Sequence, residues 1–145
     1  MAEGMVWQLD EQTLDLQGNW EKLGINTLLV QWTAVNGVSY VKGGPWPTAA
    51  RLPDWESIAR QPWARNVILG LAGHSDEVLA RADFSHLADV SARMARLPTP
   101  LNVVGWYFPV EIDSSWQDMR QLAPLLNRLP RPLWISLYDS ANVGS

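Results

Sequence analysis

Two carboxylates stand at the end of the most apolar stretch of the sequence, VVGWYFPVEIDSSW (Val103–Trp116), where Glu111 and Asp113 follow three consecutive aromatic residues. Burial against aromatic rings disfavours the charged form of a carboxyl and raises its pKa, so that the acid can donate a proton near neutral pH. A second, better-solvated carboxylate then acts as nucleophile or base, which is the chemistry of glycosidic bond cleavage. We expect Glu111, the longer side chain, to be the general acid and Asp113 to be a candidate partner. Alternatively, both acids are surface residues near the N-terminus of the next helix, where negative charge is favoured.

Acidic, amide, imidazole and aromatic side chains also follow the other apolar segments of the chain. Since functional groups of a parallel β/α sheet gather at the carboxyl ends of its strands, these residues are expected to converge. Asp10, just after the first segment, is a further catalytic candidate. The candidate substrate-binding residues share this position at strand ends, and they are Gln31, Trp32, His74, Trp106, Tyr107, Tyr138 and Asp139.

Five short segments have the apolar, β-branched character of buried strands. They are Met5–Leu9, Ile25–Thr33, Asn66–Gly73, residues 101–108 and Pro132–Tyr138.

Helical patterns separate these strands. Leu16, Trp20 and Leu23 are spaced as one helix face that Gly24 ends. Asp54 is placed to cap a short helix that runs through Arg60. Ser75 is the expected cap of a longer helical region, whose apolar stripe is Leu87, Val90, Met94 and Leu97.

Two segments are less regular. Residues 36–53 form a Gly/Pro-rich connection that is too long for a plain loop, so it is expected to be functional or flexible. Ser115 and Asp118 have the spacing of a capping box before a fourth helix. Pro124 is expected to kink or split that helix, because proline lacks the backbone N–H.

Alternating apolar strands and helices predict an α/β fold with a parallel sheet. The first strand-to-helix turn, QLDEQTLD, has none of the glycines that a dinucleotide-binding unit needs. A (β/α) barrel is therefore favoured, but a complete one has eight units and about 250 residues. We expect residues 1–145 to be a single domain forming about half of a TIM barrel, with five parallel strands and four intervening helical segments. Its two open edges predict pairing in a homodimer.

The composition excludes several classes of protein. The chain of 145 residues has a formal net charge of −4 and no cluster of Lys and Arg, so no nucleic-acid partner is expected. No apolar run approaches the roughly 18–20 residues of a membrane span, and the lack of cysteine excludes disulfides and thiolate chemistry. No set of His, Asp and Glu has metal-ligand spacing, so neither a metal nor another cofactor is expected. The nine tryptophans form either a Trp-rich core or platforms for sugar rings.

Two segments, LGINTLLVQWTAV (Leu23–Val35) and GWYFPVEID (Gly105–Asp113), resemble the signature segments of the DUF4434 family of bacterial TIM-barrel proteins similar to glycoside hydrolases. The resemblance implies a (β/α)8 fold and a glycosidase-like role at the barrel mouth, with Glu111 at the acid position after the fourth strand. The later strands, and any carboxylate on the seventh, lie outside this sequence. Exported members are common in the family, and MAEG reads as an added start before a mature chain. The expected location is thus periplasmic or secreted, with the cytoplasm as the alternative.

Three functions follow from these patterns. The first is a glycoside hydrolase-like enzyme, with Glu111 as acid. The second is a non-catalytic carbohydrate-binding protein, in which Trp32, Trp106 and Tyr107 stack on sugar rings. The third is a truncated barrel with a structural role only.

Overall fold

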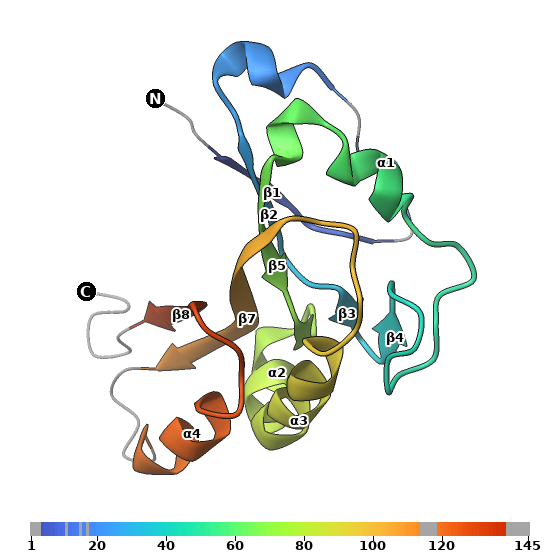
Figure 1. Ribbon diagram of the computed structural model, residues 1–145. Coiled ribbons are helices and arrows are strands. Elements are labelled where there is room, and N and C mark those ends of the chain that lie inside the picture. Colours follow the sequence, from blue (N-terminus) through green and yellow to red (C-terminus); the bar gives the residue numbers. More distant parts are fainter. Residues whose placement is uncertain (1–3, 11, 15, 17, 114–118, 139–145) are drawn as a thin grey trace.

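The computed structural model describes residues 4–10, 12–14, 16, 18–113 and 119–138, which form a five-stranded parallel sheet with helices packed on it (Figure 1). The strands of this sheet are β1 (Gly4–Trp7), β2 (Thr27–Val30), β5 (Asn66–Gly70), β7 (Val103–Asp113) and β8 (Leu133–Tyr138). The predicted α/β class is confirmed, and the predicted strands are found with shifted ends.

Helices and 3₁₀ turns occupy the connections between the strands. They are η1 (Trp20–Leu23), α1 (Trp55–Ala59), η2 (Pro62–Ala64), α2 (Glu77–Ala82), α3 (Phe84–Met94) and α4 (Met119–Leu126). Among the described helices, none has the length and apolarity needed to cross a membrane.

The strands follow one another across the sheet in chain order, β1-β2-β5-β7-β8, and each is parallel to its neighbour. A doubly wound sheet reverses its strand order at a switch point, whereas the described strands show no reversal. β1 and β8 are the two edges of this sheet, and the described strands do not close into a barrel.

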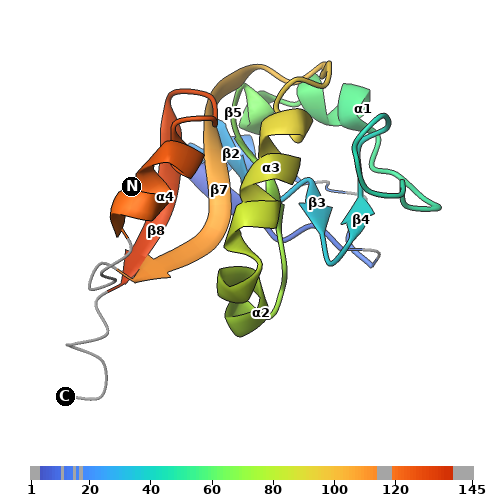
Figure 2. The same cartoon turned by 90° about the horizontal axis from the view of Figure 1, so that it is seen from below.

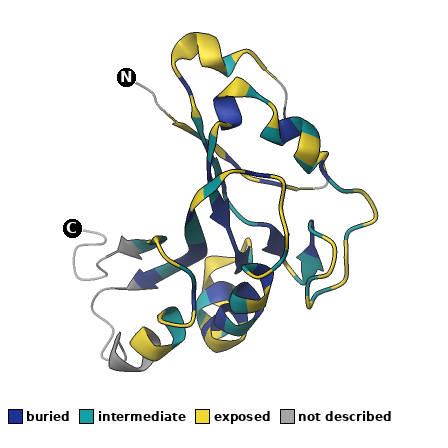
Figure 3. Ribbon diagram, in the orientation of Figure 1, coloured by how far each residue is buried: buried dark blue, intermediate teal, exposed yellow. Residues whose placement is uncertain are grey.

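One face of the sheet is buried under the helices. Figure 2 shows α3 and α4 on either side of β7, and Figure 3 shows buried residues, in dark blue, along the central strands. Leu28 and Val67 are neighbours on β2 and β5, and Ile58 of α1 and Trp63 of η2 belong to the same core cluster. Further along the sheet, Phe108 of β7 packs with α3. Burying a side chain of this size contributes roughly 1.5–3 kcal/mol, so this core fixes the positions of the strand ends.

The opposite face carries apolar side chains outside the two buried clusters of the described residues. Val6, Leu29 and Ile68 are paired neighbours there, since they alternate with core residues on their strands. Val6 remains 59% exposed and Trp134 47% exposed. The indole of Trp134 lies against Gly105, where a Cβ would stand 2.0 Å from the ring. We call this surface the open face.

The segment before Gly24 differs from the predicted helix. It has a single 3₁₀ turn, η1, which Gly24 ends in the left-handed region with a φ of 83°. Trp20 packs edge-on against Trp63 with ring centroids 4.9 Å apart. Leu16 and Trp20 pack against the core, whereas Leu23 is 66% exposed, so the three residues do not form one buried helix face.

The region after Ser75 consists of two helices, and the prediction that Ser75 caps it is wrong. The carboxylate of Asp76 caps α2 by accepting hydrogen bonds from two backbone N–H groups, at 2.9 and 3.3 Å. The predicted buried stripe is confirmed for Leu87, Val90 and Met94. As expected, Asp54 caps α1 by accepting from the N–H of Ser57 at 3.0 Å.

The Gly/Pro-rich connection contains a hairpin of β3 (Ala34–Val35) and β4 (Val38–Ser39). Asn36 and Gly37 form its turn with φ angles of 54° and 83°, as a type I′ turn requires. β6 (Ala72–Gly73) pairs in parallel with β3 and completes a small sheet in the order β4-β3-β6. The Asn-Gly pair is the sequence signal for this hairpin, so the connection is not a plain loop.

Pro124 lies inside α4, and the helix continues to Leu126. The predicted capping box of Ser115 and Asp118 lies outside the described residues. β7 is longer than expected and includes Glu111 and Asp113 within the strand, rather than in a loop after it.

Candidate functional site

A small pocket opens at the carboxyl ends of the sheet strands, with a volume of about 120 Å³. We call it the acid pocket. The predicted site residues that line it are Gln31, Trp32, His74, Tyr107 and Glu111. Gln8, Ser75 and Glu77 also line it, and none of them was expected as a site residue. The expected convergence at the strand ends therefore holds for these five predicted residues.

Glu111 owes its position to an irregularity in the pairing of β7 with β8. The register runs from Phe108 opposite Ile135 directly to Glu111 opposite Ser136, so two residues of β7 are extra. The neighbours of Glu111 along the strand are buried in the helix-covered core, whereas Glu111 itself is half-buried and reaches the pocket. Beside it, the hydroxyls of Tyr107 and Ser136 are hydrogen-bonded at 2.6 Å. The irregularity thus places the Glu111 carboxylate at the carboxyl end of the sheet, while its neighbours along the strand stay in the core.

Glu77 is the second carboxyl of the acid pocket, and it is a direct partner of Glu111. Burial raises the pKa of Glu111 above its ordinary value of 4.5, and the charge of Glu77 and a hydrogen bond between the two side chains raise it further. Arg81 acts in the opposite direction. Glu77 lies in the first turn of α2, with an exposed side chain 4.0 Å from the Arg81 guanidinium. The raised pKa favours the protonated form of Glu111, which is the form that a general acid needs.

His74 is held by contacts from two directions. Its Nε2 lies 2.9 Å from Oδ2 of Asp83, which can only accept, so Nε2 is the donor. Trp46 stacks on the imidazole with ring centroids 5.8 Å apart and an interplanar angle of 25°. The buried Nδ1 has no hydrogen-bond partner within the described part of the chain. With the proton on Nε2, this buried nitrogen is an acceptor.

Trp32 is fixed at the end of β2 by a long-range hydrogen bond. Its indole Nε1 donates to the carbonyl of Leu9, after β1, at 2.7 Å. The backbone N–H of Gln31 donates to the carbonyl of Trp7 at 2.8 Å. These bonds join the ends of β1 and β2, so the Trp32 indole is held in position before any ligand binds.

A second, wider depression lies next to the acid pocket, and we call it the outer groove. Its volume is about 640 Å³, and it shares Gln8, Trp32 and Ser75 with the acid pocket. Asp10 lines the outer groove and not the acid pocket. Its Oδ1 accepts hydrogen bonds from the Gln12 N–H at 2.8 Å and from the Thr13 hydroxyl at 3.0 Å. The structure therefore does not join Asp10 to Glu111 as a catalytic partner, because the Asp10 carboxylate holds a local turn.

Trp106 is not among the residues that line the acid pocket. Trp106 packs against both core clusters, on the same face as Phe108. The side chains of Asp113 and Tyr138 lie outside the described part of the structure, and so does Asp139.

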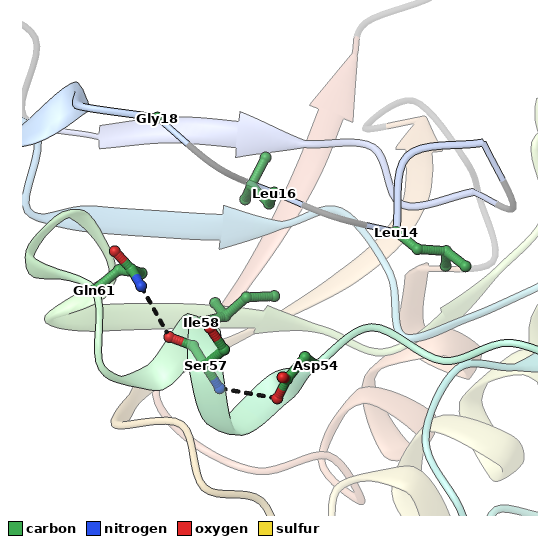
Figure 4. A pocket seen from close by; sticks show the side chains of 7 residues that line it. All are labelled: Leu14, Leu16, Gly18, Asp54, Ser57, Ile58 and Gln61. Atoms are coloured by element: carbon green, nitrogen blue, oxygen red, sulfur yellow. Dashed lines mark hydrogen bonds between the residues drawn. The ribbon is translucent and has the colours of Figure 1, made fainter.

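Another cavity, of about 330 Å³, lies between the segment around Leu14–Gly18 and α1 (Figure 4). Its polar groups are engaged in helix structure: Asp54 accepts from the Ser57 N–H, and the Gln61 amide donates to the Ser57 carbonyl at 3.3 Å. Since these groups are already paired, this cavity offers little to a polar ligand.

Within the described residues, no group of three or more His, Asp or Glu side chains is arranged to hold a metal ion. Comparison of the chain with models of protein families, with curated proteins and with solved structures finds no match. The class that the fold defines is an α/β protein with a parallel sheet, and the acid pocket is its candidate site.

Proposed function

We propose that this protein is a glycoside hydrolase-like protein that acts on a carbohydrate in the acid pocket, with Glu111 as the proton donor. The observation that carries the proposal is the pair of Glu111 and Glu77 in a pocket walled by Trp32 and Tyr107. A protonated carboxyl supplies the acid, and an aromatic plate supplies the apolar surface that packs on a sugar ring. The resemblance of residues 23–35 and 105–113 to the DUF4434 family supports the same function.

In the proposed reaction, Glu111 gives its proton to the glycosidic oxygen while the bond to the anomeric carbon breaks. Glu77 takes a proton from the water that attacks this carbon. The two carboxyls need about 6.5–9.5 Å between them for such a water, or about 5–5.5 Å for direct attack. In the proposed reaction the ligand turns Glu77 away from Glu111 to reach such a separation. Arg81, 4.0 Å from Glu77, is the group that receives it.

A second candidate, binding without cleavage, is favoured by the hydrogen bond between Glu111 and Glu77. While the two carboxyls are bonded to each other, no glycosidic bond can enter between them. In this case Trp32 and Tyr107 contact the sugar ring, and the carboxyls hydrogen-bond to its hydroxyls.

The test combines hydrolysis and binding assays on neutral glycans with Glu111→Gln, Glu77→Gln and, as a matched surface control, Glu56→Gln. We expect Glu111→Gln to lower the hydrolysis rate by about 10²–10⁴, the usual contribution of a general acid, and Glu56→Gln to leave it unchanged. Full activity of Glu111→Gln refutes its role as acid. Binding by the parent protein without any product supports the second candidate.

The proposal includes a finer description of the fold as about half of a (β/α) barrel. Its support is the unbroken strand order, the helices on a single face and the apolar open face, which corresponds to the interior of a barrel. We also propose that the edges β1 and β8 pair between two copies of the chain, because each has a neighbour on one side only among the described strands.

A further inference from the structure

We propose that the outer groove is a second sugar-binding subsite, so that the ligand is an extended chain of sugars rather than a single sugar. The chain passes across Trp32 from the outer groove into the acid pocket. This inference rests on the proposed function, and it adds the length of the substrate and the place where its further units bind.

The volumes of the two depressions indicate that the ligand extends over both. The acid pocket, at about 120 Å³, is smaller than the roughly 300–1,000 Å³ of ordinary ligand sites. The outer groove, at about 640 Å³, lies within that range. The two depressions share Gln8, Trp32 and Ser75, so they adjoin each other. A ligand that reaches Glu111 and has an ordinary contact area must therefore extend into the outer groove.

The lining of the outer groove suits a neutral ligand with many hydroxyls. Gln8 and Gln12 bring amide groups, each of which both donates and accepts. Apolar surface comes from Trp32 and Val38. Among the described residues that line the groove there is no Lys or Arg, which disfavours phosphorylated or otherwise anionic ligands.

One wall of the outer groove is held by local hydrogen bonds. Asn36, at the turn of the β3–β4 hairpin, donates from Nδ2 to the Ser75 hydroxyl at 3.0 Å. Its Oδ1 accepts from the Ser75 N–H, also at 3.0 Å. This two-way contact fastens the hairpin to the segment that precedes α2. Since the groove wall is fastened before binding, little ordering is needed when a glycan enters.

The test measures dissociation constants for β-1,4-linked glucose and N-acetylglucosamine oligomers, from the monomer to the hexamer, by calorimetry. Gln12→Ala removes an amide from the groove and Val38→Phe fills it. Gln61→Ala is the matched control, since it deletes the same side chain at the cavity beside α1. Thermal melts establish that each variant is folded. Because the two groove variants change different residues, one of them still tests the subsite if the other is unstable.

We expect the parent protein to bind longer oligomers more tightly than the monomer. Gln12→Ala should weaken binding of long oligomers by about twofold to tenfold, the loss of one hydrogen bond, and should leave monomer binding unchanged. Affinity that does not depend on chain length, or groove variants that behave as Gln61→Ala does, overturns the second subsite while the proposed function stands. If none of these oligomers binds, the proposed function is refuted together with the subsite.

Discussion

Gly70, at the end of β5, lies so close to the backbone of β2 that a single methyl group should disturb both the fold and the acid pocket. A Cβ at this position would stand 2.2 Å from the carbonyl oxygen of Gln31 and 2.3 Å from that of Val30. Both are backbone atoms and cannot rotate away, so the two strands have to part by roughly 1 Å. Overpacking a well-packed interior costs about 1–3 kcal/mol, and a clash with fixed backbone lies at the upper end.

We therefore expect Gly70→Ala to lower the free energy of unfolding by about 3 kcal/mol. At about 2–4 °C for each kcal/mol in a chain of this size, the melting temperature should fall by roughly 10 °C. Tryptophan fluorescence during urea and thermal unfolding measures both quantities. Because Gln31 lines the acid pocket, the same variant should also weaken glycan binding.

Gly4→Ala is the matched control, since Gly4 is also a strand glycine facing a carbonyl of the neighbouring strand. Its Cβ would be 3.2 Å from the Thr27 oxygen, at the edge of the sheet. We expect a change of at most about 0.5 kcal/mol. If Gly70→Ala unfolds within that same margin of the parent protein, the close approach of β2 and β5 does not exist as described.

Two further predictions concern the pH dependence of stability and the assembly of the chain. In the unfolded chain Glu111 ionises near its ordinary pKa of 4.5, whereas the folded protein keeps the proton to higher pH. Between the two pKa values the folded state therefore holds more protons than the unfolded state. The stability of the fold falls as the pH rises through this interval. Relative to the parent, Glu111→Gln should therefore gain stability as the pH rises above 4.5. Urea titrations at several pH values measure this difference in the free energy of unfolding, and a difference that stays constant across the range contradicts the raised pKa. Pairing of the β1 and β8 edges predicts the mass of two chains in light scattering after gel filtration, whereas a well-folded species with the mass of one chain contradicts it.

The strands, and the edge of the sheet at which they all end, could be predicted because their sequence signals are local. Segments such as residues 66–73 are short and apolar, and parallel strands end at one edge of a sheet whatever their order. This is why Gln31, Trp32, His74 and Glu111 were expected together without knowledge of any contact. The Asn36-Gly37 turn was not predicted, although both residues suit positive φ angles.

The partners of these residues depend on long-range packing, which the sequence does not display. Glu77 reaches Glu111 because α2 packs beside β7, and no spacing in the sequence relates the two. Trp106 and Tyr107 are both aromatic, so the composition of the segment could not show which of them faces the core. Asp10 was expected in the site, but a short side chain after a strand competes for local backbone groups, and here it holds a turn.

The two extra residues of β7, Pro109 and Val110, set a rule for changes in length at this point. Side chains alternate between the faces of a strand, so inserting or deleting one residue before Glu111 would turn its carboxylate into the hydrophobic core. Removing both residues would keep Glu111 on the same face of the sheet. It would shift the carboxylate along the strand, away from the carboxyl end, by roughly 7 Å, at about 3.3 Å per residue. Natural variants of this protein should therefore differ in this segment by even numbers of residues, or by substitution alone.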